Sequence, residues 1–362
     1  MKKIYLKCVY KKNLGDDLLV KIICDRYPKE KFYLMNYLGG GISPKISNLN
    51  EKKITITTFR IFRKIAHITK SFHIIENHII KKCDFVVSIA GSIFMETKAL
   101  ETDGRIDWFK NVKKDLYLIG SNIGPIFSKS YVERVKRDVF SRAKDICLRD
   151  KKSYELVKDI KSVRYAPDIV FSFDVDKYKN IIEKKKVIIS VINIDDKIKQ
   201  MVNPNKSKYY HLINDFINKF IDEGYEVELF SFCSAEKDDV AISELLTQND
   251  NHSKVKTVYY DGNIDSAIKE LASAKVIIGT RFHANVIGML LNKTVIPIIY
   301  NDKTRELLKD LSFKGKYVDL DSIDEFNIND LKEKNLDYKI NIEKQKKEAE
   351  KHFEKLDKIL EK

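Results

Sequence analysis

KVIIGTRFHA, residues 275–284, decides the fold class because a buried strand is followed there directly by a helix. The apolar run Val276–Ile278 ends at Gly279, as expected for a strand that is covered on both faces of a sheet. Residues 285–291 have the apolar composition of a core helix, and a second apolar run follows at Val295–Tyr300. Strand, helix and strand in this order predict a parallel α/β sheet.

Outward from this stretch, strands and helices alternate through both halves of the chain. In the first half, strands are expected at 4–10, 31–35, 54–58, 85–89, 116–121 and 146–149, and helices at 15–25, 72–82, 131–143 and 151–157. In the second half, strands are expected at 187–192, 226–232, 255–260, 276–278, 295–300 and 317–320, and helices at 210–223, 236–246, 264–272, 282–291 and 303–311. A polar helix at 342–360 closes the chain.

The chain has 362 residues, more than one hydrophobic core usually supports, so two domains are expected. A stretch rich in lysine and aspartate between 173 and 186 interrupts the apolar pattern and predicts the linker. The predicted fold class is α/β, with two tandem Rossmann-like α/β/α domains, 1–175 and 186–335, a cleft between them, and a C-terminal helix within 336–362. This architecture is glycosyltransferase-B-like.

The composition is that of a globular protein with a highly charged surface, since 43% of residues are hydrophobic and 33% are charged. No apolar run reaches the length of a membrane-spanning helix, and Met1–Lys7 is expected to form a first strand rather than a signal peptide. Five scattered cysteines predict free thiols in a reducing cytoplasm. The net charge of +14 suits phosphorylated substrates, lipid surfaces or polyanions, but heavy lysine usage explains it equally well.

Arg281 and His283 stand where the strand at 276–278 ends and the next helix begins. Ligands bind at the carboxyl ends of strands in open α/β sheets, and helix N-termini attract anions. Lys303 stands just past the next strand, at the same predicted sheet edge. The three side chains predict a site for a phosphorylated or carboxylated substrate. The other histidines lack such a context and are expected to be structural or exposed.

Arg149 ends the short apolar strand at 146–149 and is expected at a sheet edge. A surface pair with Asp150 would be worth little, whereas a guanidinium can bind a carboxylate or phosphate through two parallel bonds, and we favour that function. Asp168 follows, either to orient another side chain or to cap a turn.

Three further turns follow predicted strands. Asn13-Leu14-Gly15-Asp16-Asp17 is either a plain turn with an aspartate helix cap or a site where Asp16 binds or deprotonates a sugar hydroxyl. The turns at Gly91-Ser92 and at Asn122 are each explained as simple turns, but two at successive strand ends favour a binding rim.

No residue pattern indicates a metal site, a P-loop or a dinucleotide fingerprint. Residues 59–82 mix basic and apolar side chains. This pattern has two explanations: an amphipathic surface resting on an anionic membrane, or an ordinary helix with a basic solvent face, which we favour.

Taken in order, these segments resemble the polysaccharide pyruvyltransferase family. The resemblance covers residues 13–16, 90–94, 119–125, 148–154, 167–171, 279–284 and 297–303. Its most specific part is Gly-x-Arg-x-His-Ala, an apolar helix, a proline-containing strand, then Tyr-x-x-Lys. Ser92 stands where a second glycine is common and Phe282 where leucine or tyrosine is common, which affects substrate detail more than reaction type.

The resemblance implies phosphoenolpyruvate as co-substrate, with no cofactor and no metal. The acceptor is a sugar of a growing cell-surface polysaccharide, often lipid-linked, and the product is a pyruvate ketal that bridges two hydroxyls. The N-terminal domain would take the acceptor and the C-terminal domain phosphoenolpyruvate, in the cytoplasm at the inner face of the membrane.

By resemblance, Arg149, His283 and Lys303 supply the cations for phosphoenolpyruvate, with Arg281 as a fourth candidate. Protonated His283 is then either the general acid at the methylene carbon or the group that stabilises departing phosphate. A helix N-terminus lowers the pKa of a histidine and a bound phosphate raises it, and the two effects oppose each other. Asp16 is the candidate base. Asn13, Gly15, Gly91, Ser92 and Asn122 are the candidate acceptor contacts.

Two rival functions remain at this level. A nucleotide-sugar glycosyltransferase of the same architecture would also place cations in the C-terminal domain, with Glu306 as a candidate ribose ligand. A non-catalytic polyanion-binding protein would explain the charge but not the clustered strand-end motifs, so no nucleic-acid partner is expected.

Overall fold

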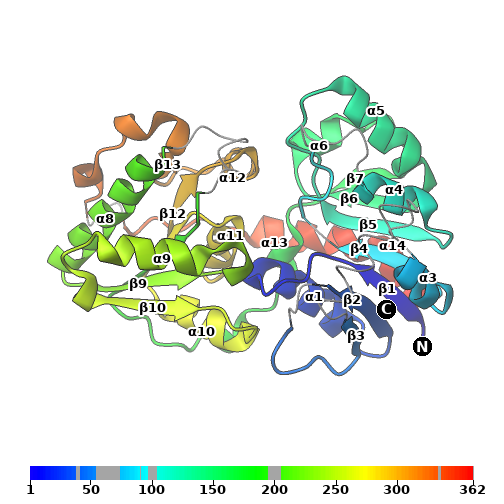
Figure 1. Cartoon of the computed structure of the whole chain (residues 1–362), viewed down its shortest axis with the longest axis horizontal. Coiled ribbons are helices and arrows are strands. Elements are labelled where there is room, and N and C mark those ends of the chain that lie inside the picture. Colours follow the sequence, from blue (N-terminus) through cyan, green and yellow to red (C-terminus); the bar gives the residue numbers. More distant parts are fainter. Residues whose placement is uncertain are drawn as a thin grey trace. The chain divides into compact units, whose positions relative to one another are not determined.

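The computed structural model describes residues 1–37, 41–53, 74–89, 91–96, 104–194, 205–332 and 336–361 (Figure 1). Contacts divide the chain into two compact units. The first contains residues 1–11, 16–172 and 345–362, and the second contains residues 12–15 and 173–344. Each unit is built on one parallel sheet.

The sheet of the first unit has the strand order β3-β2-β1-β4-β5-β6-β7, and its strand pairs are parallel. Its strands are β1 (Lys3–Lys7), β2 (Lys31–Asn36), β3 (Leu49–Lys53), β4 (Phe85–Ile89), β5 (Leu116–Ser121), β6 (Ala143–Leu148) and β7 (Val163–Tyr165). Its helices are α1 (Leu14–Arg26), α3 (Ile74–Lys81), α4 (Gly104–Asn111), α5 (Lys129–Asp138), η1 (Phe140–Arg142), α6 (Lys151–Glu155) and η2 (Ile169–Ser172). The strand order reverses between β1 and β4, which is the place where such sheets bind ligands.

The sheet of the second unit has the order β10-β9-β8-β11-β12-β13 and reverses between β8 and β11. Its strands are β8 (Lys186–Val191), β9 (Glu226–Ser231), β10 (Val255–Tyr259), β11 (Val276–Gly279), β12 (Thr294–Ile299) and β13 (Val318–Asp319). Its helices are η3 (Asp176–Tyr178), α8 (Lys206–Asp222), η4 (Ser234–Glu236), α9 (Asp238–Thr247), η5 (His252–Lys254), α10 (Ile264–Ser273), α11 (Phe282–Leu290), α12 (Asp302–Asp310), η6 (Leu320–Glu325) and η7 (Ile328–Asp330).

The C-terminal residues form α13 (Glu343–Ala349), η9 (Glu350–Phe353) and α14 (Glu354–Leu360), where the sequence predicts one continuous helix. From residue 345 onward they belong to the first unit, to which Arg26 anchors them. Arg26 donates two hydrogen bonds to Asp357, from Nε at 3.0 Å and from Nη2 at 2.7 Å.

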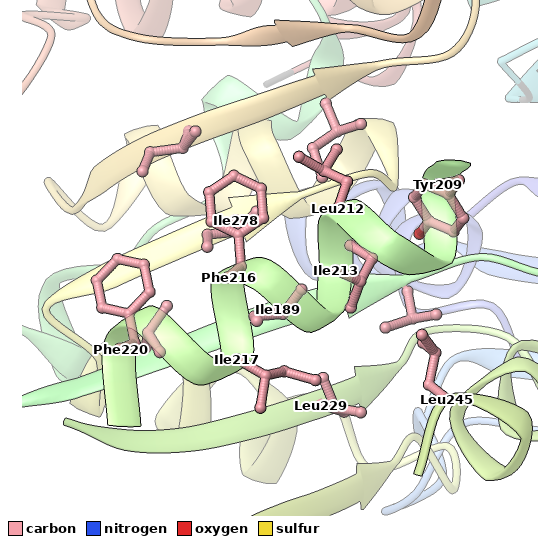
Figure 2. Close-up of a cluster of buried hydrophobic side chains, with 14 of the residues drawn as sticks. Ile189, Tyr209, Leu212, Ile213, Phe216, Ile217, Phe220, Leu229, Leu245 and Ile278 are labelled. Atoms are coloured by element: carbon pink, nitrogen blue, oxygen red, sulfur yellow. The ribbon is translucent and has the colours of Figure 1, made fainter. Parts of the chain in front are cut away.

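Helix α8 shows how the sequence builds the second core. Asn205 caps the helix by accepting hydrogen bonds from the N–H groups of Ser207 and Lys208. Ile213, Phe216, Ile217 and Phe220 then recur at helical spacing and are fully buried. Figure 2 shows this face packed over strand residues that include Ile189, Leu229 and Ile278. Burying a side chain of this size contributes about 2–3 kcal/mol.

Most predicted elements are confirmed, with bounds that shift by a few residues. The predicted helix 131–143 is wrong in extent, because α5 ends at Asp138 and one turn of η1 leads into β6. Helix α4 and strands β3 and β7 were not predicted, since eight, five and three residues are too short to show a period. The predicted strand 54–58 lies outside the described residues.

Candidate functional site

Arg149 follows β6 at the carboxyl edge of the first sheet, as predicted, and its side chain is only 5% exposed. Its backbone N–H donates to the carbonyl of Ser121 at 3.0 Å, which fixes it to the end of β5. The guanidinium donates from Nη1 to Asp168 Oδ2 at 3.0 Å and from Nη2 to Asn122 Oδ1 at 2.8 Å. Charge-assisted bonds of this kind hold an arginine in one orientation before any ligand arrives.

The two predicted glycine turns meet at this guanidinium. Ser92 Oγ donates to Asn122 Oδ1 at 3.0 Å and accepts from Arg149 Nη2 at 3.3 Å. A Cβ atom on Gly91 would lie 2.7 Å from Arg149 Nη1, so the glycine leaves room for the arginine. The structure thus gives Ser92 and Asn122 a role in holding Arg149, and their contact with an acceptor stays a prediction.

Both roles considered for Asp168 are present in the structure. Its Oδ2 pairs with Arg149, and its Oδ1 accepts from the N–H of Val170 at 2.9 Å at the start of η2. Asp150 instead caps α6 by accepting from the N–H of Ser153 at 2.7 Å. The alternative of an exposed Arg149–Asp150 pair is therefore wrong, because Arg149 is buried and points to Asp168.

His283 and Lys303 occupy equivalent places in the second unit. His283 is the second residue of α11 and Lys303 the second residue of α12, as the sequence predicts. These helices follow β11 and β12, which are neighbours and parallel, so both helix N-termini lie at the carboxyl edge of one sheet. Both residues are half-buried. At such a position a protonated side chain attracts an anion by its charge, and the helix N-terminus attracts it by the helix dipole.

Arg281 is the N-cap residue of α11, and its side chain is 12% exposed. It forms a bidentate pair with Asp238 of α9, whose Oδ2 lies 3.0 Å from Nε, and a further ion pair with Glu236 of η4. Burial would lower the pKa of the guanidinium, but the two carboxylates outweigh it and raise the pKa. Arg281 is therefore paired with two carboxylates in this structure, and its contact with phosphoenolpyruvate stays a prediction.

The strand-to-helix turn that carries His283 is held by its neighbours. Ser190, near the end of β8, accepts the N–H of Thr280 through its carbonyl at 3.3 Å and the N–H of Arg281 through its Oγ at 3.1 Å. Asn285 donates to the carbonyl of Gly279 at 2.9 Å. A Cβ on Gly279 would lie 2.1 Å from Asn285 Oδ1, so only glycine fits this turn.

The remaining predicted residues lie at the start of α1. Asn13 Oδ1 accepts the N–H of Gly15 at 3.1 Å, so Asn13 caps this helix. The expectation of an aspartate cap is wrong, because Asp16 and Asp17 lie inside the first turn, where they still favour the helix dipole. The role of Asp16 as base and the acceptor contacts of Asn13 and Gly15 stay predictions.

Two groups of polar residues were missed. The sequence predicts Glu236 and Asp238 within a helix and does not pair them with Arg281. Two acidic residues just after β9 were the signal that could have predicted this pairing. At the end of β1, Lys7 donates to buried Glu76 at 2.9 Å and lies over the ring of Trp108. Burial opposes ionisation of Glu76, but Lys7 and hydrogen bonds lower its pKa.

Comparison with known proteins identifies the family. The Polysaccharide pyruvyl transferase family matches residues 13–302, most of the chain. The chain belongs to this family. Its membership confirms the resemblance carried by the strand-end motifs. The matched residues include Arg149, Arg281 and His283, and Lys303 follows directly after them. A transferase of polysaccharide biosynthesis is thereby supported.

One relative of this chain is the amylovoran biosynthesis protein AmsJ of Erwinia amylovora. It is 24% identical in an alignment 271 positions long that covers 67% of this chain and 63% of AmsJ, so less than two thirds of that protein is matched.

Solved structures of other proteins support the glycosyltransferase-B-like fold of this chain. Anabaena HepE in complex with UDP and glucose has a TM-score of 0.56 at 11% identity, with all of both chains covered. The S. aureus MnaA–UDP co-structure has a TM-score of 0.57 at 13% identity, covering 96% of this chain and 91% of that one. At these identities the likeness concerns the fold alone.

Every helix among the described residues is too short or too polar to cross a bilayer. Of the predicted amphipathic surface at 59–82, residues 59–73 lie outside the described part of the chain. The expectations of membrane contact, of no metal and of no cofactor stay predictions.

Proposed function

We propose that this member of the pyruvyl transferase family moves the pyruvyl group of phosphoenolpyruvate onto a sugar and closes a pyruvate ketal. The observation that carries the proposal is the position of His283 and Lys303 on the first turns of two helices that follow neighbouring strands at one sheet edge. A lysine, a histidine that can be protonated and two helix N-termini at one edge suit a small, strongly anionic donor. Arg149, held rigidly in the first unit, adds a planar donor set that matches a carboxylate or phosphate.

Each residue has a distinct role in this proposal. Arg149 and Lys303 bind the anionic groups of phosphoenolpyruvate. Protonated His283 gives its proton to the methylene carbon. Arg281 keeps its two carboxylate partners and holds the turn that presents His283. Asp16 accepts the proton of an acceptor hydroxyl.

The reaction is an addition to the enol double bond followed by a substitution at the same carbon, and it conserves atoms and charge. Protonation of the methylene group makes the adjacent carbon oxocarbenium-like, and one sugar hydroxyl forms a bond to it and gives up its proton. The bond from this carbon to the phosphate oxygen then breaks. A second hydroxyl takes its place, and its proton leaves with inorganic phosphate. A general acid of this kind contributes about 10²–10⁴-fold.

The acceptor in this proposal is a sugar of a cell-surface polysaccharide under construction, carried on a lipid at the cytoplasmic face of the membrane. Two hydroxyls of the acceptor that one carbon can bridge are needed to close the ketal. The family's role in polysaccharide biosynthesis supports this acceptor class.

Product release separates this proposal from a nucleotide-sugar transferase, the runner-up. The purified protein is incubated with saccharide acceptors and either phosphoenolpyruvate or a panel of nucleotide sugars. We expect acceptor-dependent release of inorganic phosphate, strongly reduced in Arg149→Ala and Lys303→Ala through KM and in His283→Ala through kcat. Release of nucleotide with no phosphate would favour the glycosyltransferase, and near-normal turnover of His283→Ala would exclude the acid role.

A further inference from the structure

A buried histidine from the C-terminal segment contacts the residue that precedes Asp168, the partner of Arg149. His352, in η9, is fully buried, and its Nε2 lies 2.7 Å from the carbonyl oxygen of Pro167. Pro167 immediately precedes Asp168, the carboxylate that pairs with Arg149 at 3.0 Å. Residues 185 positions apart in the chain thus meet next to the aspartate that pairs with the candidate anion-binding arginine.

The chemistry of this contact is defined by its partner. A carbonyl oxygen only accepts hydrogen bonds, so Nε2 of His352 carries the proton. The other ring nitrogen, Nδ1, is buried without a hydrogen-bond partner among the described residues, so the ring is neutral. Pro167 has no N–H of its own, so its carbonyl is the backbone group through which a neighbour can hold it.

The segment that carries His352 is itself held in place. Arg164, in β7, donates from Nη2 to the carbonyl of His352 at 3.0 Å and pairs with Asp145 at 2.7 Å. Arg26 pairs with Asp357 one helix later. The segment that carries His352 is therefore fixed by Arg164 at the backbone of His352 and by Arg26 at Asp357.

We propose that His352 is a positioning residue for the donor site. Through Pro167 it holds the Asp168 carboxylate, and through Asp168 it sets the orientation of the Arg149 guanidinium. The C-terminal residues from 345 onward are, on this account, a part of the donor-binding machinery and not only a cover for the first unit. The inference rests on the proposed function, because it assumes that Arg149 binds phosphoenolpyruvate.

Leucine and glutamine at position 352 test the proposal. His352→Leu keeps a buried side chain but cannot donate, whereas the amide of His352→Gln can reach the same carbonyl. We expect the leucine variant to raise KM and Kd for phosphoenolpyruvate about tenfold with kcat changed less than twofold, and the glutamine variant to recover most of that loss. Val135→Ala, a fully buried core change elsewhere in the first unit, controls for lost stability and should leave KM unchanged.

Each outcome bears on a different claim. A wild-type protein without measurable affinity for phosphoenolpyruvate would refute the proposed function and this inference with it. Wild-type binding with equal Kd in His352→Leu would refute the positioning role alone, as would equal losses in the leucine and glutamine variants. If the leucine variant does not fold, His352→Asn replaces it, because its shorter amide cannot reach Pro167. In that case equal Kd for the asparagine and glutamine variants would overturn the proposal.

Discussion

His352 gives the first unit a pH-dependent stability that one substitution removes. Burial lowers the pKa of His352 from 6.5 to about 4, with a smaller opposing effect of the Pro167 carbonyl and further contributions from Arg164, Asp168 and Arg149. Between these two pH values the unfolded chain binds a proton that the folded chain does not. The stabilisation is therefore complete above pH 6.5 and is lost as the pH falls towards 4, by about 3 kcal/mol in all.

The assay is urea unfolding of the wild type and His352→Gln, followed by the fluorescence of Trp108. This is the single tryptophan of the chain and lies in α4 of the first unit, the same unit as His352. From pH 7 to pH 5 the wild type should lose about 2 kcal/mol more than the glutamine variant, because glutamine does not titrate. Carboxylates shared by both proteins cancel in this difference. Equal losses in the two proteins would refute the reasoning.

Three further predictions follow from single contacts. Gly91→Ala should raise KM for phosphoenolpyruvate about tenfold by displacing the guanidinium that lies 2.7 Å from the new Cβ, while Gly41→Ala, whose Cβ meets nothing within 4 Å, should match the wild type in the same assay. Arg281→Ala should cost about 3–5 kcal/mol in urea unfolding, because it leaves the buried carboxylate of Asp238 without its charged partner, and a cost below 1 kcal/mol would argue against the pair. Burial raises the pKa of Glu228 to about 7, so its stabilising protonated form is lost as the pH rises through 7. Glu228→Gln should therefore exceed the wild type in unfolding free energy by about 1–3 kcal/mol at pH 8, with the difference disappearing at about pH 4.

The strand ends that carry Arg149, His283 and Lys303 could be predicted from the sequence because each follows a continuous apolar run. Strands of a parallel sheet are buried on both faces, so they stand out from their surroundings without any alignment. A strand end then places the next polar residue at a known edge of the sheet.

The partners of these residues could not be predicted in the same way. Arg281 meets Asp238 across 43 positions, and His352 meets Pro167 across 185. Contacts of this kind depend on which strands are neighbours, and no local period encodes that. Asn122 shows the consequence, because the sequence places it at a strand end but does not reveal that its side chain accepts a hydrogen bond from Arg149.

Short elements were missed for a different reason. Helix α4 has eight residues and strand β7 has three, so neither spans enough positions to show a hydrophobic period. Both are nevertheless important for the first unit. Helix α4 supplies Trp108 to the cluster around Glu76, and β7 supplies Arg164, which holds the C-terminal segment.

Mass spectrometry of the saccharide tests the central claim most directly. Lipid-linked or free saccharides are incubated with the wild-type protein and either phosphoenolpyruvate or a panel of nucleotide sugars, with His283→Ala in parallel. The account predicts that a saccharide gains the mass of one pyruvate less one water in the wild-type reaction, with the product sharply reduced in the variant. A saccharide that gains a hexose from a nucleotide sugar, and never a pyruvyl group from phosphoenolpyruvate, would contradict it.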